Sequence, residues 1–147
     1  MRLLGFNLNK ISAEKHPNSS ADVKIVPNVN IEDIKDVKSE GPKTKEEFIG
    51  VKFSYTINYE PGYAKLEFSG ELLASVDSKV AKEVTKNWKD KKLEGDFKVF
   101  LFNVILRRTN VKALELEDDL NLPLHVPLPS VNKESFKPSS EKQPRKE

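Results

Sequence analysis

Hydrophobic and polar residues alternate along residues 51–59, and they alternate again along residues 64–74 after the turn sequence Glu-Pro-Gly at 60–62. A period of two residues is typical of a β-strand with one buried face. The two segments are therefore predicted to form a β-hairpin. Gly70 interrupts the second segment, which indicates a bulge or the close approach of another backbone at this position.

Two shorter alternating patterns precede the hairpin, at residues 4–8 and 23–31, and they predict two further strands. The second pattern contains Pro27, whose nitrogen cannot donate a hydrogen bond to a sheet ladder. This strand is therefore expected at a sheet edge or next to a bulge. The polar stretches 15–22 and 39–45 contain proline together with serine or glycine, and we expect them to be loops.

After the hairpin the apolar residues take the spacing of a helix. Those between Val80 and Trp88 fall on one helix face, and Asp77 or Ser78 is placed to cap its start. A short helix is predicted here. We expect Trp88 to anchor this helix to the sheet.

A second, longer helical pattern begins at Asp96, another candidate for an N-cap, and continues through Leu114. The helix must end before Pro123, because proline disfavours helical geometry in the residue ahead of it. Both sides of this helix are apolar around Phe102 and Leu106, and a helix that is apolar nearly all round is buried on more than one side. In so small a domain this predicts a subunit interface, with at least a dimer, or a groove for an apolar ligand.

Residues 120–129 place leucines between prolines, a composition typical of an extended segment that docks on its own domain or on a partner. Beyond Val131 the chain is rich in Lys, Glu, Ser and Pro and cannot bury enough apolar surface to fold. We therefore expect one domain at 1–131 and a disordered charged tail at 132–147. The predicted fold class is α+β, a four-stranded antiparallel sheet followed by a short and a long helix.

The composition supports one ordinary intracellular domain. The chain has 147 residues, of which 37% are hydrophobic, enough for a core without disulfides or metal. It has no cysteine, which excludes a disulfide framework, a thiolate zinc site and a cysteine nucleophile. The apolar stretch at the N-terminus is too short for a signal peptide, and no stretch approaches the roughly 20 apolar residues of a membrane span. The cytoplasm is the expected location.

No constellation of residues in the sequence is typical of catalysis. The two histidines, His16 and His125, lie in proline-containing loops without a second ligand at metal-binding spacing, and we expect His125 to be a loop residue rather than a catalytic base. Acidic residues cluster near the end of the long helix, at Glu115, Glu117, Asp118 and Asp119, where a solvated acidic face is favoured over a divalent-cation site. Neither an enzymatic activity nor a cofactor or metal is expected.

The stretch between residues 79 and 112 contains ten basic residues and only four acidic ones. Lys86, Lys89, Arg107 and Arg108 of this stretch are candidates for a patch that meets an anionic partner such as RNA or the ribosome. The alternative is a lysine-coated helix surface that keeps the protein soluble, because no aromatic residues are interleaved with the basic ones. The sequence leaves both interpretations open.

Several short runs resemble those of one known family. They are Asn-Val-Asn-Ile-Glu-Asp-Ile at 28–34, Trp88, Asn-Val-Ile-Leu at 103–106 with Ala-Leu at 113–114, and Leu-Asn-Leu-Pro at 120–123 with the segment that continues to 129. Together with the order of strands and helices, they resemble archaeal SecB-like proteins, relatives of the bacterial export chaperone SecB. The resemblance covers residues 1 to 131.

The resemblance implies a chaperone or adaptor. SecB-family proteins assemble as dimers or tetramers through their helical layer and hold unfolded polypeptides in apolar grooves without nucleotide. It places the residues for assembly or partner binding on the long helix, at Phe100, Leu101, Val104 and Ile105, and it places Phe53, Tyr55 and Phe68 on the sheet. The domain lacks the acidic character of bacterial SecB, and residues 122–131 replace the short helix that contacts the export ATPase, so an export role does not follow.

Three functions are therefore compatible with the sequence. The leading one is a SecB-like chaperone or adaptor that binds polypeptide clients or a protein partner and forms a homodimer or larger assembly. The second is a ribosome- or RNA-associated factor. The third is a structural subunit that uses residues 122–131 as an extended arm.

Overall fold

The computed structural model describes residues 1–17, 22–37 and 46–136. Four strands come first: β1 (Arg2–Lys15), β2 (Lys24–Val37), β3 (Glu46–Glu60) and β4 (Ala64–Asp77). They are followed by helix α1 (Ser78–Trp88), helix α2 (Gly95–Asp119) and a short 3-10 helix at Lys133–Phe136. The expected loop at 39–45 lies outside the described residues, as do residues 18–21 of the other expected loop and residues 137–147 of the expected tail.

The strands form one antiparallel sheet in the order β1-β4-β3-β2. The predicted hairpin is β3 and β4, which pair along their length up to Tyr59 opposite Ala64. β1 and β2 are the two edge strands, so Pro27 lies on an edge as expected. The predicted fold class, α+β with four antiparallel strands and a short and a long helix, is confirmed.

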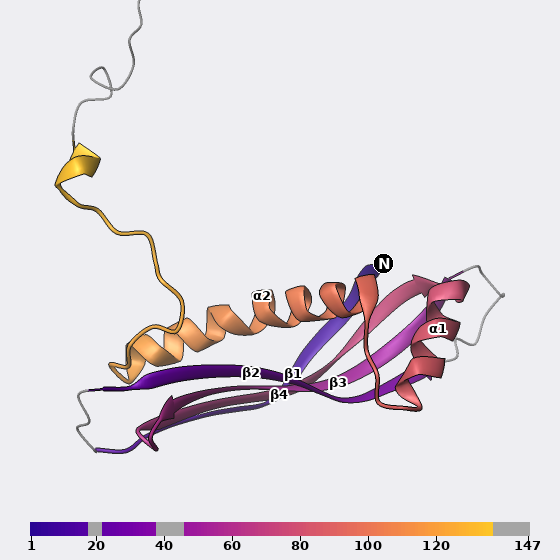
Figure 1. Cartoon of the computed structure of the whole chain (residues 1–147), viewed down its shortest axis with the longest axis horizontal. Coiled ribbons are helices and arrows are strands. Elements are labelled where there is room, and N and C mark those ends of the chain that lie inside the picture. Colours follow the sequence, from indigo (N-terminus) through magenta and orange to yellow (C-terminus); the bar gives the residue numbers. More distant parts are fainter. Residues whose placement is uncertain (18–21, 38–45, 137–147) are drawn as a thin grey trace, which may run out of the picture.

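Both helices cover the same face of the sheet (Figure 1). The side chain of Asp77 accepts a hydrogen bond from the backbone N–H of Val80 at 3.5 Å, so Asp77 caps α1 as predicted. The expectation for Asp96 was wrong. The N-cap of α2 is Glu94, which makes no capping hydrogen bond with its side chain, and Asp96 lies within the first turn. An acidic side chain is still favourable there, because it faces the positive end of the helix dipole.

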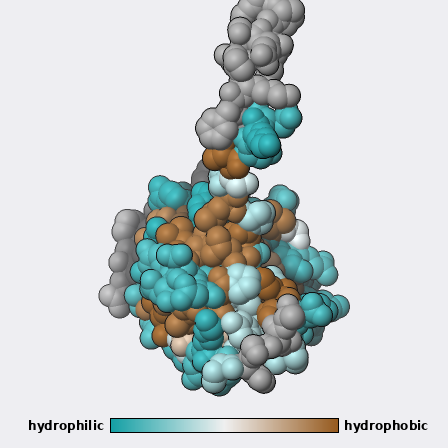
Figure 2. Space-filling view, turned by 90° about the vertical axis from the view of Figure 1, so that its left-hand side faces the viewer, coloured by the Kyte–Doolittle hydropathy of each residue, from teal (hydrophilic) through white to brown (hydrophobic). Residues whose placement is uncertain are grey.

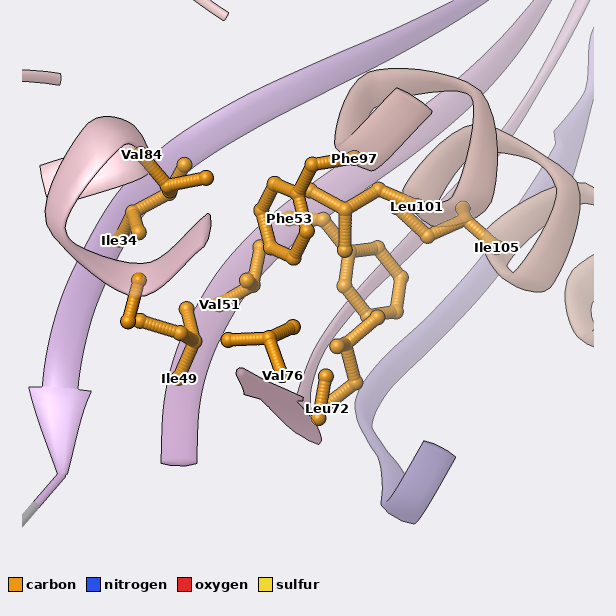
Figure 3. Close-up of a cluster of buried hydrophobic side chains, with 12 residues drawn as sticks. Ile34, Ile49, Val51, Phe53, Leu72, Val76, Val84, Phe97, Leu101 and Ile105 are labelled. Carbon is orange, nitrogen blue, oxygen red and sulfur yellow. The ribbon is translucent and has the colours of Figure 1, made fainter. Parts of the chain in front are cut away.

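Alternate residues of β3 and β4 point toward the helices and form the core. One apolar cluster lies under α1 and the first half of α2, where Phe97, Leu101 and Ile105 pack against strand residues such as Phe53 (Figure 3). Trp88 packs against this cluster, as expected for an anchor of α1. A second cluster lies under the last part of α2 and contains Tyr55, Tyr59 and Leu122 among its members. Helix α2 therefore spans the whole sheet and joins the two clusters.

Gly70 lies where the backbone of β1 is close against β4. A side chain at this position would collide with the backbone carbonyl of Asn7 and lie within 3.1 Å of the ring of Phe53. The register of β1 shifts between Leu8 and Lys10, next to the residue that pairs with Gly70. The predicted bulge and the predicted close approach are both confirmed.

Residues 120–131, which we call the leucine-proline segment, dock on their own domain at the start of the segment and then leave it. Leu122 is buried in the second cluster, whereas Leu128 and Val131 are exposed. The chain departs from the end of the molecule at which α2 finishes (Figure 1), and apolar surface gathers below the point of departure (Figure 2). The 3-10 helix at Lys133–Phe136 lies within the segment 132–147 that was expected to be disordered.

Candidate functional site

Helix α2 buries every fourth residue from Phe97 to Glu117 against the sheet, and these are Phe97, Leu101, Ile105, Thr109, Ala113 and Glu117. Of the four residues expected to contact a partner, Leu101 and Ile105 are fully buried in the core. A strict four-residue spacing turns the side chains of Leu101 and Ile105 toward the sheet. Phe100 and Val104 are half-buried on the flank of the helix and remain accessible.

A hollow of about 550 Å³ lies along this flank. Its lining comes from one residue of β1 and five residues of α2: Leu3, Phe100, Asn103, Val104, Arg107 and Arg108. We call it the β1–α2 groove. Leu3, Phe100 and Val104 make it apolar, while Asn103 and the two arginines supply hydrogen-bond donors. This composition suits a ligand that combines apolar groups with hydrogen-bond acceptors.

The groove runs beside an open edge of the sheet. Within the described part of the chain β1 pairs with β4 alone, so backbone N–H and C=O groups along its other side have no strand partner. Leu4 and Ile11 of β1 are exposed. Long edge strands with exposed apolar residues are sites at which another chain can add by backbone hydrogen bonding.

The four residues of the expected anionic-partner patch fall into two separate places. Arg107 and Arg108 line the β1–α2 groove. Lys86 and Lys89 line a different hollow of about 230 Å³ at α1, which also contains the carboxylates of Asp36 and Glu47. The basic stretch therefore does not form a single uninterrupted surface, and its α1 part faces acidic side chains of this chain.

A buried polar cluster lies at the other end of α2, and sequence reasoning missed it. The Glu117 carboxylate is 2.8 Å from the Tyr59 hydroxyl and 2.8 Å from Nδ1 of His125. The other imidazole nitrogen, Nε2, lies 2.8 Å from Oδ1 of Asn110, which also accepts a hydrogen bond from the Tyr55 hydroxyl at 2.9 Å. The side chains of His125 and Glu117 are 2% and 0% exposed.

The cluster corrects one expectation, that for Glu117. His125 is a packed loop residue, in keeping with the sequence, whereas Glu117 was expected on a solvated acidic face together with Glu115, Asp118 and Asp119. The last three are exposed, but Glu117 is buried because it falls on the four-residue stripe of α2 that faces the sheet. That spacing was visible in the sequence and places Glu117 on the same face as Ala113.

The cluster holds the leucine-proline segment on the domain. The Tyr59 hydroxyl lies 2.6 Å from the carbonyl oxygen of Pro123, and the backbone N–H of His125 donates to Glu117 at 3.3 Å. Burial and the hydrogen bond to Glu117 raise the pKa of Tyr59 far above its ordinary value, so this hydroxyl keeps its proton. Because the side chains of Glu117 and His125 are closed off from solvent, a substrate cannot reach them, and the arrangement suits attachment rather than catalysis.

The described ranges were compared with the requirements of a metal site and of a membrane-spanning helix. No group of three or more His, Asp or Glu side chains there is placed to hold a metal ion. No described helix has the length and apolar character needed to span a bilayer.

No model of a known protein family matches this sequence, and a comparison with curated proteins finds no significant match. Among solved structures, the chain is similar to a SecB-like chaperone of Mycobacterium tuberculosis, determined in complex with a ChAD peptide from the HigA1 antitoxin. The two chains share 11% sequence identity over 90% of this chain and 91% of the other, with a TM-score of 0.43. The likeness is one of fold.

Proposed function

We propose that this protein binds extended or unfolded polypeptide in the β1–α2 groove and acts as a chaperone or adaptor rather than as an enzyme. The observation that carries the proposal is the combination of an apolar groove on the flank of α2 with the open edge of β1 beside it. An extended chain can satisfy its backbone groups on such an edge while its apolar side chains enter the groove.

The size of the groove suits a short stretch of extended chain. Residues 100 to 108 of α2 cover roughly 12 Å of helix axis. At about 3.3 Å per residue this is the length of about four residues of a strand. Such a short apolar contact gives weak and reversible binding, which is what a protein that holds clients without nucleotide requires.

The test is the suppression of aggregation by the full-length protein. We expect it to slow the aggregation of a chemically unfolded client at a stoichiometric ratio, measured by light scattering. Phe100→Asp and Val104→Asp should remove this effect, because a charge is placed on the apolar lining. Val99→Asp is the matched control, since Val99 lies on the same helix, is 60% exposed and does not line the groove.

The same flank of α2 could instead contact a second copy of this chain. The homodimer or larger assembly expected from the sequence is therefore proposed to form through this surface. Sedimentation velocity of the same three variants separates the two occupants. If Phe100→Asp yields monomers from a wild-type dimer, the flank is an assembly surface. The client proposal fails if the wild-type protein does not delay aggregation, or if Val99→Asp lowers its effect as much as Phe100→Asp does.

A further inference from the structure

We propose that the β1–α2 groove selects extended peptides that carry acidic side chains next to apolar ones. This inference rests on the proposed function and names the class of polypeptide that the groove prefers. It is carried by the charges that line the groove and by the way in which the arginines are held.

The groove has a positive charge that its own surroundings do not neutralise. Its charged lining residues are Arg107 and Arg108, and no carboxylate belongs to the described lining. Neither arginine forms a salt bridge with an acidic side chain among the residues that the structure describes. The hollow at α1 is different, because Asp36 and Glu47 lie there beside the lysines. A carboxylate on a ligand would therefore meet only cations among the charged lining residues of the groove, whereas the hollow at α1 is also lined by two acidic residues.

Arg108 is held in place before any ligand arrives. Its guanidinium lies over the ring of Phe6, 5.3 Å from the ring centroid. A stacked guanidinium keeps its N–H donors at the edge of its plane, where a carboxylate can accept two parallel hydrogen bonds. Because the side chain is already ordered by Phe6, less conformational entropy is lost on binding. Both arginines are exposed, and Arg107 adds a second cation beside Arg108.

The order of residues along α2 predicts the spacing within the ligand. Phe100 and Val104 provide the apolar part of the lining, and the arginines follow toward the C-terminal side of the groove. The distance from Phe100 to Arg108 along the helix is roughly 12 Å, or about three to four residues of an extended chain. An apolar side chain and an acidic side chain about three residues apart would therefore contact both parts at once. A lysine at the second position would be repelled.

Fluorescence anisotropy with three labelled peptides and the full-length protein tests this inference. The peptides share an apolar centre of leucine and phenylalanine and carry two aspartates, two asparagines or two lysines at a distance of three residues. At low salt we expect the aspartate peptide to bind about fivefold more tightly than the asparagine peptide, as two exposed ion pairs of ordinary strength would give. The lysine peptide should bind most weakly.

Removal of the arginine charges should remove the preference and keep the binding. In the double variant Arg107→Gln with Arg108→Gln, the aspartate and asparagine peptides should bind equally well. The control is Lys86→Gln with Lys89→Gln, which deletes the same number of charges outside the groove and should keep the fivefold preference. Arg107→Gln alone should lose part of it without disturbing the contact between Arg108 and Phe6.

The outcomes separate the inference from the proposed function. Equal affinity of the wild-type protein for the aspartate and asparagine peptides would overturn the acidic preference and leave polypeptide binding intact. Absence of binding for all three peptides would overturn the proposed function itself. A preference that persists in the arginine double variant would show that the acidic side chain is recognised elsewhere.

Discussion

Glu117 and His125 connect the last turn of α2 to the segment that follows it. Each buried group has several partners, because the carboxylate contacts the imidazole and the Tyr59 hydroxyl while the imidazole also contacts Asn110. Both imidazole nitrogens of His125 therefore have an oxygen atom at 2.8 Å. Polar groups with this many hydrogen-bond partners can offset much of the cost of removing them from water.

We expect His125→Ala to lower the free energy of unfolding by about 3–5 kcal/mol, because loss of one partner leaves the other buried without its main contact. Urea unfolding followed by circular dichroism measures the change. The control is Glu115→Ala, which removes the exposed pair of Lys112 and Glu115 at 3.3 Å and should cost less than about 1 kcal/mol. Similar losses in the two variants would contradict a structural role for the buried pair.

Because of Tyr55, we expect the stability of the domain to fall at alkaline pH. Burial, and after it the charge of Glu117, raises the pKa of Tyr55 from 10.0 to about 12. The folded protein therefore retains a proton that the unfolded chain releases above pH 10. The stabilisation is complete below pH 10 and is lost between pH 10 and about 12, with a slope of about 1.4 kcal/mol per pH unit for one group.

Denaturant unfolding at a series of pH values above 9 measures this dependence. Tyr55→Phe should make the decline less steep, because one of the hydroxyl groups that resist ionisation is gone. Tyr59 is shifted in the same direction and should keep part of the slope. A wild-type stability that stays constant from pH 10 to 12 would contradict the burial of these hydroxyl groups.

The sequence predicted apolar burial better than polar burial. The period of two residues placed Phe53 and Tyr55 on the inner face of the sheet, and the structure confirms it. It did not predict Glu117 and His125, because their burial depends on a contact between two segments that are eight residues apart and separated by a helix end. A polar residue on an apolar stripe was the available signal, and its partner follows only from the path of the chain after α2.

At the scale of elements, the backbone of β1 lies close against β4 at Gly70. We expect Gly70→Ala to destabilise the fold by about 2 kcal/mol, because the added methyl group meets the backbone of β1, which cannot move aside as a flexible side chain can. Gly5→Ala is the control, since no atom lies within 4 Å of the position that its methyl group would take. Thermal melting compares the two, and equal melting temperatures would contradict the close approach.

The leucine-proline segment is anchored on the domain at Leu122 and His125, and truncation should show how much this anchor stabilises the fold. Deletion of residues 133–147 should leave the melting temperature nearly unchanged, because a sequence of this composition contributes no buried area. Deletion of residues 121–147 also removes Leu122 and His125 and should lower it clearly. A large decrease for the shorter deletion would mean that the tail is docked.

Local patterns predicted the elements, whereas their arrangement required information from distant parts of the chain. The hairpin of β3 and β4 followed from alternation and a turn sequence, and α1 followed from spacing and its cap at Asp77. The pairing of β1 with β4 joins residues far apart in the sequence and had no local signal. For the candidate site, the sequence indicated the long helix but could not distinguish Leu101 and Ile105, which face the sheet, from Phe100 and Val104 on its flank.

At the scale of the whole molecule, the placement of both helices on one face of the sheet decides which surfaces remain open. Helix α2 covers the middle of that face and leaves the flank toward β1 open as the groove. Positive charge is divided between this flank and α1, so an RNA would have to span two separated places to contact Lys86, Lys89, Arg107 and Arg108 together. The distribution favours a compact peptide over a long polyanion.

Salt dependence distinguishes these two kinds of partner. For a neutral apolar peptide we expect the affinity to hold or to rise with salt, because burial of apolar surface is not screened and excluded salts strengthen it. Binding of RNA or ribosomes would fall steeply between low and moderate salt, because each phosphate contact releases a counterion. Anisotropy titrations of the asparagine peptide and of a labelled single-stranded RNA, each at several salt concentrations, measure both slopes.

The quadruple substitution of Lys86, Lys89, Arg107 and Arg108 with Gln completes the comparison. It should abolish any binding of RNA and leave the affinity for the neutral peptide within about a factor of two, since that peptide relies on apolar contact. If the wild-type protein instead binds the RNA tightly at moderate salt, loses it in the quadruple variant and never binds the peptide, the groove is not the site of function. The four cations, although divided between two hollows, would then have to act together on one partner.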